Sequence, residues 1–202
     1  MKPFVVMVAG GTASGKTTLV HAVAAGYPDC VVLSHDRYYR DVLDPMTHDY
    51  DHPDALDTAR MVADLADLRA GQVAHVPQYD YATHRRHAQP VALEPRALVF
   101  VEGILVLHDD RLRALADLCV YVHVDDDLRL ARRLQRDIVG RGRDPEGVLR
   151  QYLDTVRPGH QRFVAPSRFH AHVILDGAAP IEVIAAGLAA MIRARGGPVS
   201  AV

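Results

Sequence analysis

The sequence is poor in residues on which several classes of protein depend. Its two cysteines, Cys30 and Cys119, lie in short apolar runs, so we expect core thiols and neither a disulfide framework nor a cysteine metal cluster. It contains no asparagine, which excludes the NKxD guanine-reading motif of a GTPase switch. No apolar stretch approaches the length of a membrane span, and the N-terminal run is too short for a signal peptide. We therefore expect a cytoplasmic protein with no membrane partner.

Lysine is equally scarce, and its placement is informative. The 23 Lys and Arg residues include only two lysines, Lys2 and Lys16. A compact ammonium on a flexible stem suits places where a planar guanidinium does not, so Lys16 is expected to do something that arginine cannot. The net charge of -2 leaves no basic footprint for nucleic acid or an anionic membrane. Small-molecule partners are the better expectation.

Length and patterning predict one α/β domain. A chain of 202 residues that is 49% hydrophobic suits a single domain over 1–195, followed by a flexible tail at 196–202. Helical spacing recurs between five short β-rich runs, which predicts a parallel sheet with helices on both faces. The predicted strands are Phe4 to Val8, Cys30 to Leu33, Leu98 to Val101, Cys119 to Val124 and Val173 to Leu175. The predicted helices include Met61 to Leu68, Leu130 to Ile138 and Ile181 to Ile192.

A phosphate loop follows the first predicted strand. The sequence GGTASGKTT contains the glycines, the lysine and the hydroxyl of that pattern, and a chance match is expected in only about one per cent of chains of this length. The loop N-H groups and the Lys16 ammonium would bind a triphosphate, and the Thr17 hydroxyl would ligate Mg2+. The predicted nucleotide-binding residues are Gly10, Gly11, Thr12, Ala13, Ser14, Gly15, Lys16, Thr17 and Thr18.

Two acidic residues follow other predicted strands, Asp36 after the second and Glu102 after the third. Because ligands of open parallel sheets bind at the carboxyl ends of the strands, both should face the phosphate loop. Glu102 would hold Mg2+ together with Thr17. Asp36 would orient an attacking hydroxyl and accept its proton. Either acid alone would more often be a cap or loop residue, but beside a phosphate loop the functional interpretation is favoured.

An arginine-rich segment at 129–144 is predicted to form a lid. Its helical arginines share one face, opposite Leu130 and Leu134; they are Arg129, Arg132, Arg133 and Arg136. Such a face is ordinarily just solvated. Here Arg141 and Arg143 follow on a glycine-containing tip, which favours a segment that closes over phosphates.

Several blocks in series resemble the uridine kinase (uridine-cytidine kinase) family of phosphate-loop kinases. They lie between Gly10 and Arg168 in family order, and they read GGTASGKTT, LSHDRYYRD, YDHPDALD, VPQYDYATHRR, VFVEGIL, RLARRLQRDIVGRGRD and QYLDTVRPGHQRFVAPSR. The resemblance implies a three-layer P-loop NTPase fold with a β-hairpin excursion at 73–95 that binds the nucleoside. It also implies phosphorylation of uridine or cytidine at the 5'-hydroxyl by ATP or GTP with Mg2+, giving UMP or CMP, and a homotetramer.

The resemblance also implies a role for individual residues. Asp36 would be the base, with Lys16 and Arg136 as the other catalytic residues, and Arg141 would face the donor phosphates. Asp51 would bind the ribose hydroxyls. The remaining substrate-binding positions are Tyr39, Tyr79, His84, Arg133, Arg143 and Gln151, with His84 near the exocyclic group of the base. An imidazole can donate or accept there, depending on its tautomer.

Two alternatives stay open. A related phosphate-loop kinase, such as phosphoribulokinase or pantothenate kinase, would act on another hydroxyl, although the YDYATH block argues for a pyrimidine. A non-catalytic nucleoside sensor on a kinase fold is disfavoured because Lys16, Asp36 and Glu102 are all present. ADP formation would separate the enzyme from the sensor.

Overall fold

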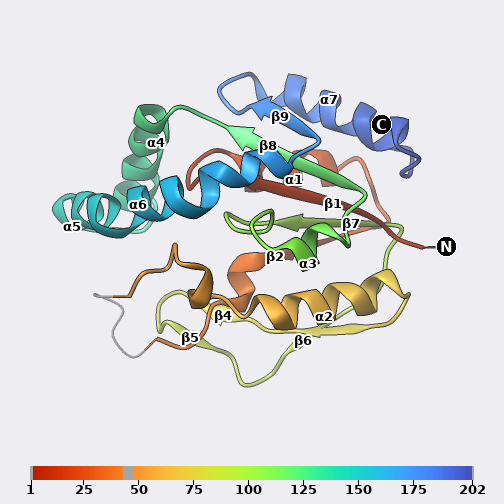
Figure 1. The fold of residues 1–202 in the computed structure, drawn as a ribbon, viewed down its shortest axis with the longest axis horizontal. Helices are drawn as coiled ribbons and strands as arrows, with labels where there is room; N and C mark the ends of the chain where they lie inside the picture. The colour runs from red at the N-terminus through yellow and green to blue at the C-terminus, as the bar shows by residue number, and fades with distance from the viewer. Residues whose placement is uncertain (1, 43–47, 202) are drawn as a thin grey trace.

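Five parallel strands form the centre of the molecule in this computed structural model, which describes residues 2–42 and 48–201 (Figure 1). The strand order is β2-β7-β1-β8-β9. Their bounds are β1 (Phe4–Gly10), β2 (Cys30–Ser34), β7 (Leu98–Glu102), β8 (Leu118–His123) and β9 (Val173–Asp176). β1 is paired on both sides, with Val5 opposite Val99 in β7 and Met7 opposite Cys119 in β8. All five strands predicted from the sequence are therefore confirmed.

Helices cover both faces of the sheet. Successive side chains of β1 point to opposite faces, and they are buried on both. Val6 and Val8 belong to the core under α1 (Lys16–Ala24) and α7 (Ile181–Ala194). Val5 and Met7 belong to the core under α2 (Thr58–Arg69) and α3 (Asp110–Arg113). The predicted three-layer α/β fold is confirmed.

The segment predicted as a β-hairpin excursion forms two short antiparallel pairs. The inner pair is β3 (Ala74–Val76) with β6 (Val91–Leu93), and the outer pair is β4 (Tyr79–Asp80) with β5 (Arg85–Arg86). Arg86 fixes the hairpin to the turn η1 (His35–Tyr38) that follows β2: its Nη2 donates to the Tyr38 carbonyl at 2.7 Å. A second turn, η2 (Pro53–Ala55), precedes α2. The contact between Arg86 and Tyr38 holds the excursion beside the carboxyl end of β2.

A long helical arm connects β8 to β9; it begins at the carboxyl end of the sheet and then returns across the sheet to the start of β9 (Figure 1). It begins with α4 (Asp126–Val139) and α5 (Pro145–Gln151), whose first turn is capped by Asp144 accepting from Gly147 N at 2.7 Å. It continues through η3 (Tyr152–Val156), α6 (Arg157–Gly159), η4 (His160–Val164) and η5 (Ala165–His170). The η3 and η4 turns are π-helical, a geometry that is common near functional sites.

The pattern of burial on α4 is the reverse of that of an ordinary amphipathic helix. Arg129, Arg133 and Asp137 are buried, whereas Leu130 and Leu134 are only half-buried. The interpretation of this helix face as merely solvated is therefore wrong for Arg129 and Arg133, because both are buried. The reason is that the inward side of α4 meets the polar phosphate loop, where Arg133 Nη1 donates to Thr12 Oγ1 at 3.1 Å, instead of an apolar core.

The last described residues run back toward the end of α1. Ala201 N donates to the Gly26 carbonyl at 2.8 Å, and Ser200 Oγ donates to the same oxygen at 3.0 Å. Cys30 and Cys119 are free thiols, the first half-buried and the second buried. Within residues 2–42 and 48–201, none of the helices has the length and apolar character needed to cross a bilayer.

Candidate active site

The phosphate loop is a tight turn between β1 and α1. Ser14 N donates to the Gly11 carbonyl at 3.1 Å and closes the turn. Gly15 precedes the helix with a φ of 92°, a conformation in which a residue with a Cβ would be strained. Because Gly15 offers no side-chain cap, the first-turn N-H groups are left for a ligand. Ser14 Oγ is buried without a hydrogen-bond partner. An anion at this helix N-terminus would satisfy the first-turn N-H groups.

Glu102 links the phosphate loop to two neighbouring strands. Its Oε2 accepts from Thr17 Oγ1 at 3.0 Å and lies 4.0 Å from Lys16 Nζ. Its Oε1 accepts from Ser34 Oγ, at the end of β2, at 2.6 Å. Because Glu102 is only 4% exposed, these partners and not water stabilise its negative charge. The structure thus brings the three predicted residues together and adds Ser34, which the sequence reasoning missed.

Asp36 lies in η1, directly after β2, and its carboxylate shares the site with Lys16 and Glu102. Burial raises the pKa of Asp36; Lys16 opposes this, and the like charge of Glu102 adds to it. A raised pKa makes a carboxylate a better proton acceptor near neutral pH. Tyr81 Oη lies 3.5 Å from Asp36 Oδ2 and is a second residue that sequence reasoning missed, although it belongs to the YDYATH block.

A cavity of about 510 Å³ opens beside the loop. It is bounded by the residues Ala13 to Thr18 of the loop, by Arg136 and Arg141 from the arm, and by the beginning of α7 at Ile181 and Ile184. Four cationic side chains therefore surround one space; they are Lys16, Arg132, Arg136 and Arg141. Arg136 and Arg141, which are predicted to face phosphates, both line this cavity.

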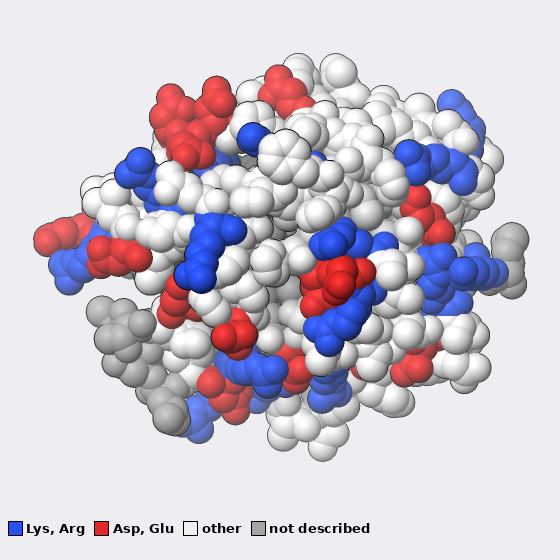
Figure 2. All heavy atoms as spheres, in the orientation of Figure 1, with Lys and Arg blue, Asp and Glu red and all other residues white. Residues whose placement is uncertain are grey.

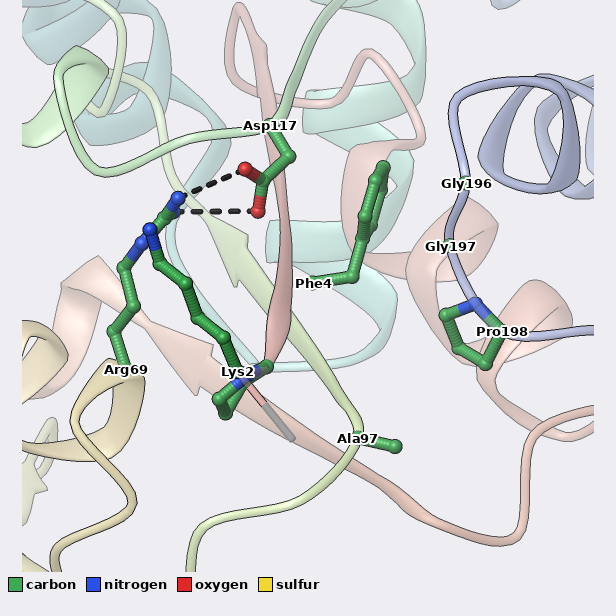
Figure 3. A pocket seen from close by; sticks show the side chains of 9 residues that line it. Lys2, Phe4, Arg69, Ala97, Asp117, Gly196, Gly197 and Pro198 are labelled. Atoms are coloured by element: carbon green, nitrogen blue, oxygen red, sulfur yellow. Dashed lines mark hydrogen bonds and ion pairs between the residues drawn. The ribbon is translucent and has the colours of Figure 1, made fainter.

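A second cavity, of about 300 Å³, lies at the opposite end of the sheet (Figure 3). Its lining includes Lys2, Phe4 and the Gly196 to Pro198 segment, together with an ion pair between Arg69 and Asp117. None of the predicted site residues lines it. The cavity beside the phosphate loop is therefore the better candidate for the active site.

Aromatic side chains gather between η1 and the hairpin. Tyr39 contacts Tyr50 edge-on with ring centroids 5.6 Å apart, and Tyr39 and Tyr79 have centroids 5.4 Å apart. The Tyr50 hydroxyl lies 2.7 Å from His84 Nδ1. His84 has a φ of 55°, an uncommon conformation for a residue with a side chain. The predicted residues Tyr39, Tyr79 and His84 thus belong to one aromatic cluster, with Tyr50 as an unpredicted fourth member.

Asp51 is buried next to this aromatic cluster. Burial raises its pKa to about 6, Arg133 opposes the shift, and Asp49 and Asp36 add to it. Gly159 in α6 packs directly against it, because a Cβ at Gly159 would lie 2.7 Å from Asp51 Cβ. The carboxylate is thus placed in a desolvated position near both Asp36 and Arg133.

Arg133, Arg143 and Gln151 are joined by one side-chain oxygen. Gln151 Oε1 accepts from Arg133 Nη2 and from Arg143 Nη1, both at 3.0 Å. Arg133 also reaches Thr12 in the phosphate loop. These contacts join the arm to the loop and bring together the predicted positions on the acceptor side.

Arg129 lies under the phosphate loop and does not join the other lid arginines. Its Nη1 is buried without a hydrogen-bond partner and would be 2.5 Å from a Cβ at Gly11. Its Nη2 pairs with Asp126 at 2.5 Å. The lid predicted at 129–144 therefore includes one arginine that packs on the loop itself, where only glycine leaves room.

The fold and this site define a phosphate-loop kinase: the loop holds an anion site at a helix N-terminus, and a carboxylate stands beside it. The chain belongs to the Phosphoribulokinase / Uridine kinase family, whose model matches residues 5–183.

Curated relatives are similar over most of the chain. A uridine kinase from Chloroflexus aurantiacus is 42% identical over 203 residues, which cover 95% of this chain and 97% of the relative. A uridine kinase from Lactococcus lactis subsp. lactis is 41% identical over 181 residues, covering 86% and 88%. Among solved structures, phosphoribulokinase from Rhodobacter spheroides has a TM-score of 0.63 at 15% identity, covering 89% of this chain and 74% of that one. The last likeness supports the fold alone.

Proposed function

We propose that this protein is a uridine kinase, which transfers the γ-phosphate of ATP or GTP to the 5'-hydroxyl of uridine or cytidine and releases UMP or CMP. The observation that carries the proposal is the adjacency of two different sites. A cationic cavity beside the phosphate loop suits a triphosphate, and a cluster of aromatic rings next to a buried carboxylate suits a nucleoside. The relatives named above carry the same activity in their names.

On the donor side, the chain supplies positive charge and N-H donors. The Lys16 ammonium and the first turn of α1 would bind the outer phosphates, and Arg136 and Arg141 would neutralise charge as the γ-phosphoryl group leaves. Arg141 is half-exposed and follows Gly140 at the end of α4. Its guanidinium pairs with Asp137 at 3.5 Å, and we expect it to turn toward the phosphates when they bind.

The oxygen donors around Glu102 fit Mg2+. In the described residues there is no group of three or more His, Cys, Asp or Glu side chains placed to hold a metal, but Mg2+ usually takes one or two carboxylates together with phosphate and water oxygens. Thr17 and Glu102 would hold it. When bound, the ion would neutralise phosphate charge. Ser34, through its hydrogen bond to Glu102, would keep the carboxylate in place.

On the acceptor side, Asp36 would receive the 5'-hydroxyl proton. Its carboxylate interacts electrostatically with Lys16 and Glu102, and its charge also raises the pKa of Asp51 and of Tyr39. Asp51 would accept hydrogen bonds from the ribose hydroxyls. The base would lie among Tyr39, Tyr50 and Tyr79, since offset and edge-on aromatic contacts suit a planar ring.

The charge on the surface agrees with a small-molecule substrate. Figure 2 shows acidic and basic side chains interspersed over the face in view, without a broad area of either sign. A polyanionic partner would need a broad basic area. The charged groups that matter for binding are instead gathered in the donor cavity.

The decisive experiment is a coupled assay of ADP formation with ATP, Mg2+ and a panel of acceptors. The panel contains uridine, cytidine, thymidine, adenosine, pantothenate and ribulose 5-phosphate. We expect turnover only with the two pyrimidine ribonucleosides. Turnover with ribulose 5-phosphate or pantothenate would move the protein to another branch of the family, and uridine binding without ADP formation would indicate a sensor.

A further inference from the structure

One buried carboxylate lies among the arginines assigned to both substrates. Asp137, near the end of α4, is fully buried and lies within 3.6 Å of four guanidinium groups. These belong to Arg133, Arg136, Arg141 and Arg143. Burial acts to raise the pKa of Asp137, but the hydrogen bond from Arg136 and the surrounding positive charges outweigh it, so the pKa is lowered and the carboxylate stays ionised.

The two oxygens of Asp137 divide these arginines according to the two sides of the site. Oδ1 accepts from Arg136 Nε at 2.8 Å and lies 3.5 Å from Arg141 Nη1; these two arginines line the donor cavity. Oδ2 lies 3.6 Å from both Arg133 Nε and Arg143 Nη1, the two arginines that share Gln151 on the acceptor side. A single side chain therefore contacts both sets.

The contacts on the acceptor side are incomplete. Asp137 Oδ2 and Arg133 Nε are both buried without a hydrogen-bond partner, although only 3.6 Å separates them. An approach of about 0.7 Å would give the usual length of a charge-assisted hydrogen bond. One carboxylate cannot neutralise four guanidinium groups, so the donor and acceptor arginines compete for its charge.

We propose that Asp137 is a positioning residue that couples the two substrate sites. A triphosphate in the donor cavity draws Arg136 and Arg141 toward its own negative charge. Asp137 then pairs fully with Arg133 and Arg143, which become fixed in the arrangement that binds the nucleoside. Donor binding thus strengthens acceptor binding, and the reverse follows by linkage. The proposal rests on the proposed function, since it assumes that both substrates bind here.

The test is calorimetric titration of uridine, with and without saturating Mg2+ and a non-hydrolysable ATP analogue. In the unaltered protein we expect uridine to bind about 5- to 20-fold more tightly with the analogue, within the usual range of coupling. Asp137→Asn should reduce that ratio to less than about twofold. A purely structural role for Asp137 would lower the melting temperature and leave the ratio unchanged, which would overturn the proposal.

Asp64→Asn is the matched control, because Asp64 is also a buried carboxylate, bonded to Tyr38 at 2.8 Å and remote from the arm. It should lose stability and keep the wild-type ratio. Arg136→Gln tests the same idea without removing the buried charge, since it frees Oδ1. It should bind uridine several-fold more tightly than the unaltered protein when no donor is present. Unchanged binding in this variant would refute the coupling even if Asp137→Asn failed to fold.

The design separates failure of the coupling from failure of the proposed function. If the unaltered protein formed ADP with uridine but showed a ratio of one, the coupling would be wrong and the uridine kinase activity would stand. If uridine neither bound nor supported ADP formation, the proposed function itself would be wrong and the coupling would fall with it.

Discussion

The amino and carboxyl ends of the central sheet contain similar charged residues but use them differently. At the amino end, both oxygens of Asp117 are occupied: Oδ1 accepts from Arg69 at 2.8 Å (Figure 3), and Oδ2 accepts from Val5 N at 2.8 Å. Arg69 also donates to the Leu115 carbonyl. This pair joins α2 to β1 and to the segment before β8.

At the carboxyl end, charged and polar groups are left with incomplete partners. Buried atoms without a hydrogen bond include Ser14 Oγ, Arg129 Nη1, Arg133 Nε and Asp137 Oδ2. Burial also raises the pKa of Asp36 and of Asp51. Unsatisfied buried groups cost stability, so their concentration at one end indicates that this end is arranged for binding. The contrast teaches that charge is used for stability at the amino end and for binding at the other.

The largest expected effect of this contrast is on turnover. Asp36→Asn should lower kcat by about two to four orders of magnitude, because the acceptor hydroxyl loses its base. Uridine affinity should change by less than about threefold, and the melting temperature should not fall, since the change removes a desolvated charge. Steady-state kinetics and calorimetry measure these quantities. Near-normal turnover would show that Asp36 is not the base.

The same substitution at the other end should have the opposite profile. Asp117→Asn should lower the free energy of unfolding by about 1–3 kcal/mol, because Arg69 and Val5 N lose a charged acceptor. Its kcat and its KM for uridine should stay within about twofold of the unaltered protein. Urea unfolding and the ADP assay provide the two measurements. A loss of activity without a loss of stability would contradict the division between the two ends.

The raised pKa of Asp51 predicts a pH dependence. In the folded protein this carboxyl takes up a proton near pH 6, whereas in the unfolded chain it does so near pH 3.9. The folded state therefore binds more protons between these values, and through this group the stability of the free protein rises as the pH falls from about 6 to about 4.

Uridine binding should show the opposite trend, because the ribose hydroxyls need the carboxylate. Below pH 6, affinity should fall by up to about tenfold per pH unit, as measured by titration without donor. Asp51→Asn should bind weakly at every pH and lose this dependence. A dependence that survives in Asp51→Asn would assign it to another group.

The smallest expected effect concerns the choice between uridine and cytidine as the substrate. A phenol donates a proton more readily than a neutral imidazole, so Tyr50 should donate to His84 Nδ1 across their 2.7 Å contact and leave Nε2 protonated. That tautomer suits the uracil carbonyl. Tyr50→Phe should therefore lower the ratio of kcat/KM for uridine to that for cytidine by about 3- to 10-fold. An unchanged ratio would show that Tyr50 does not set the tautomer.

Much of the fold was predictable because its signals are local. The apolar runs and the phosphate loop identify β1, its helix and the position of Lys16 from a few adjacent residues. Glu102 and Asp36 were predictable because strand ends meet at one edge. The residue roles on the acceptor side stay predictions that the experiments above test.

Contacts between distant residues were not predictable. Ser34 meets Glu102 across 68 positions, and Tyr50 meets His84 across 34; no local pattern relates either pair. On α4 the periodicity was visible, but which side is buried depends on what the helix packs against. Because it packs on a polar loop, Arg133 and Asp137 are inside, where a rule based on apolar cores places leucines.

The scarcity of lysine has a practical consequence. The two lysines lie at opposite ends of the molecule: Lys2 borders the cavity at the amino end (Figure 3), and the Lys16 side chain, 12% exposed, lies in the phosphate loop. An acylating reagent therefore has one lysine amine inside the site and one far outside it. Mass spectrometry of the labelled protein would report occupancy of the donor site directly, with Lys2 as an internal standard and no turnover required.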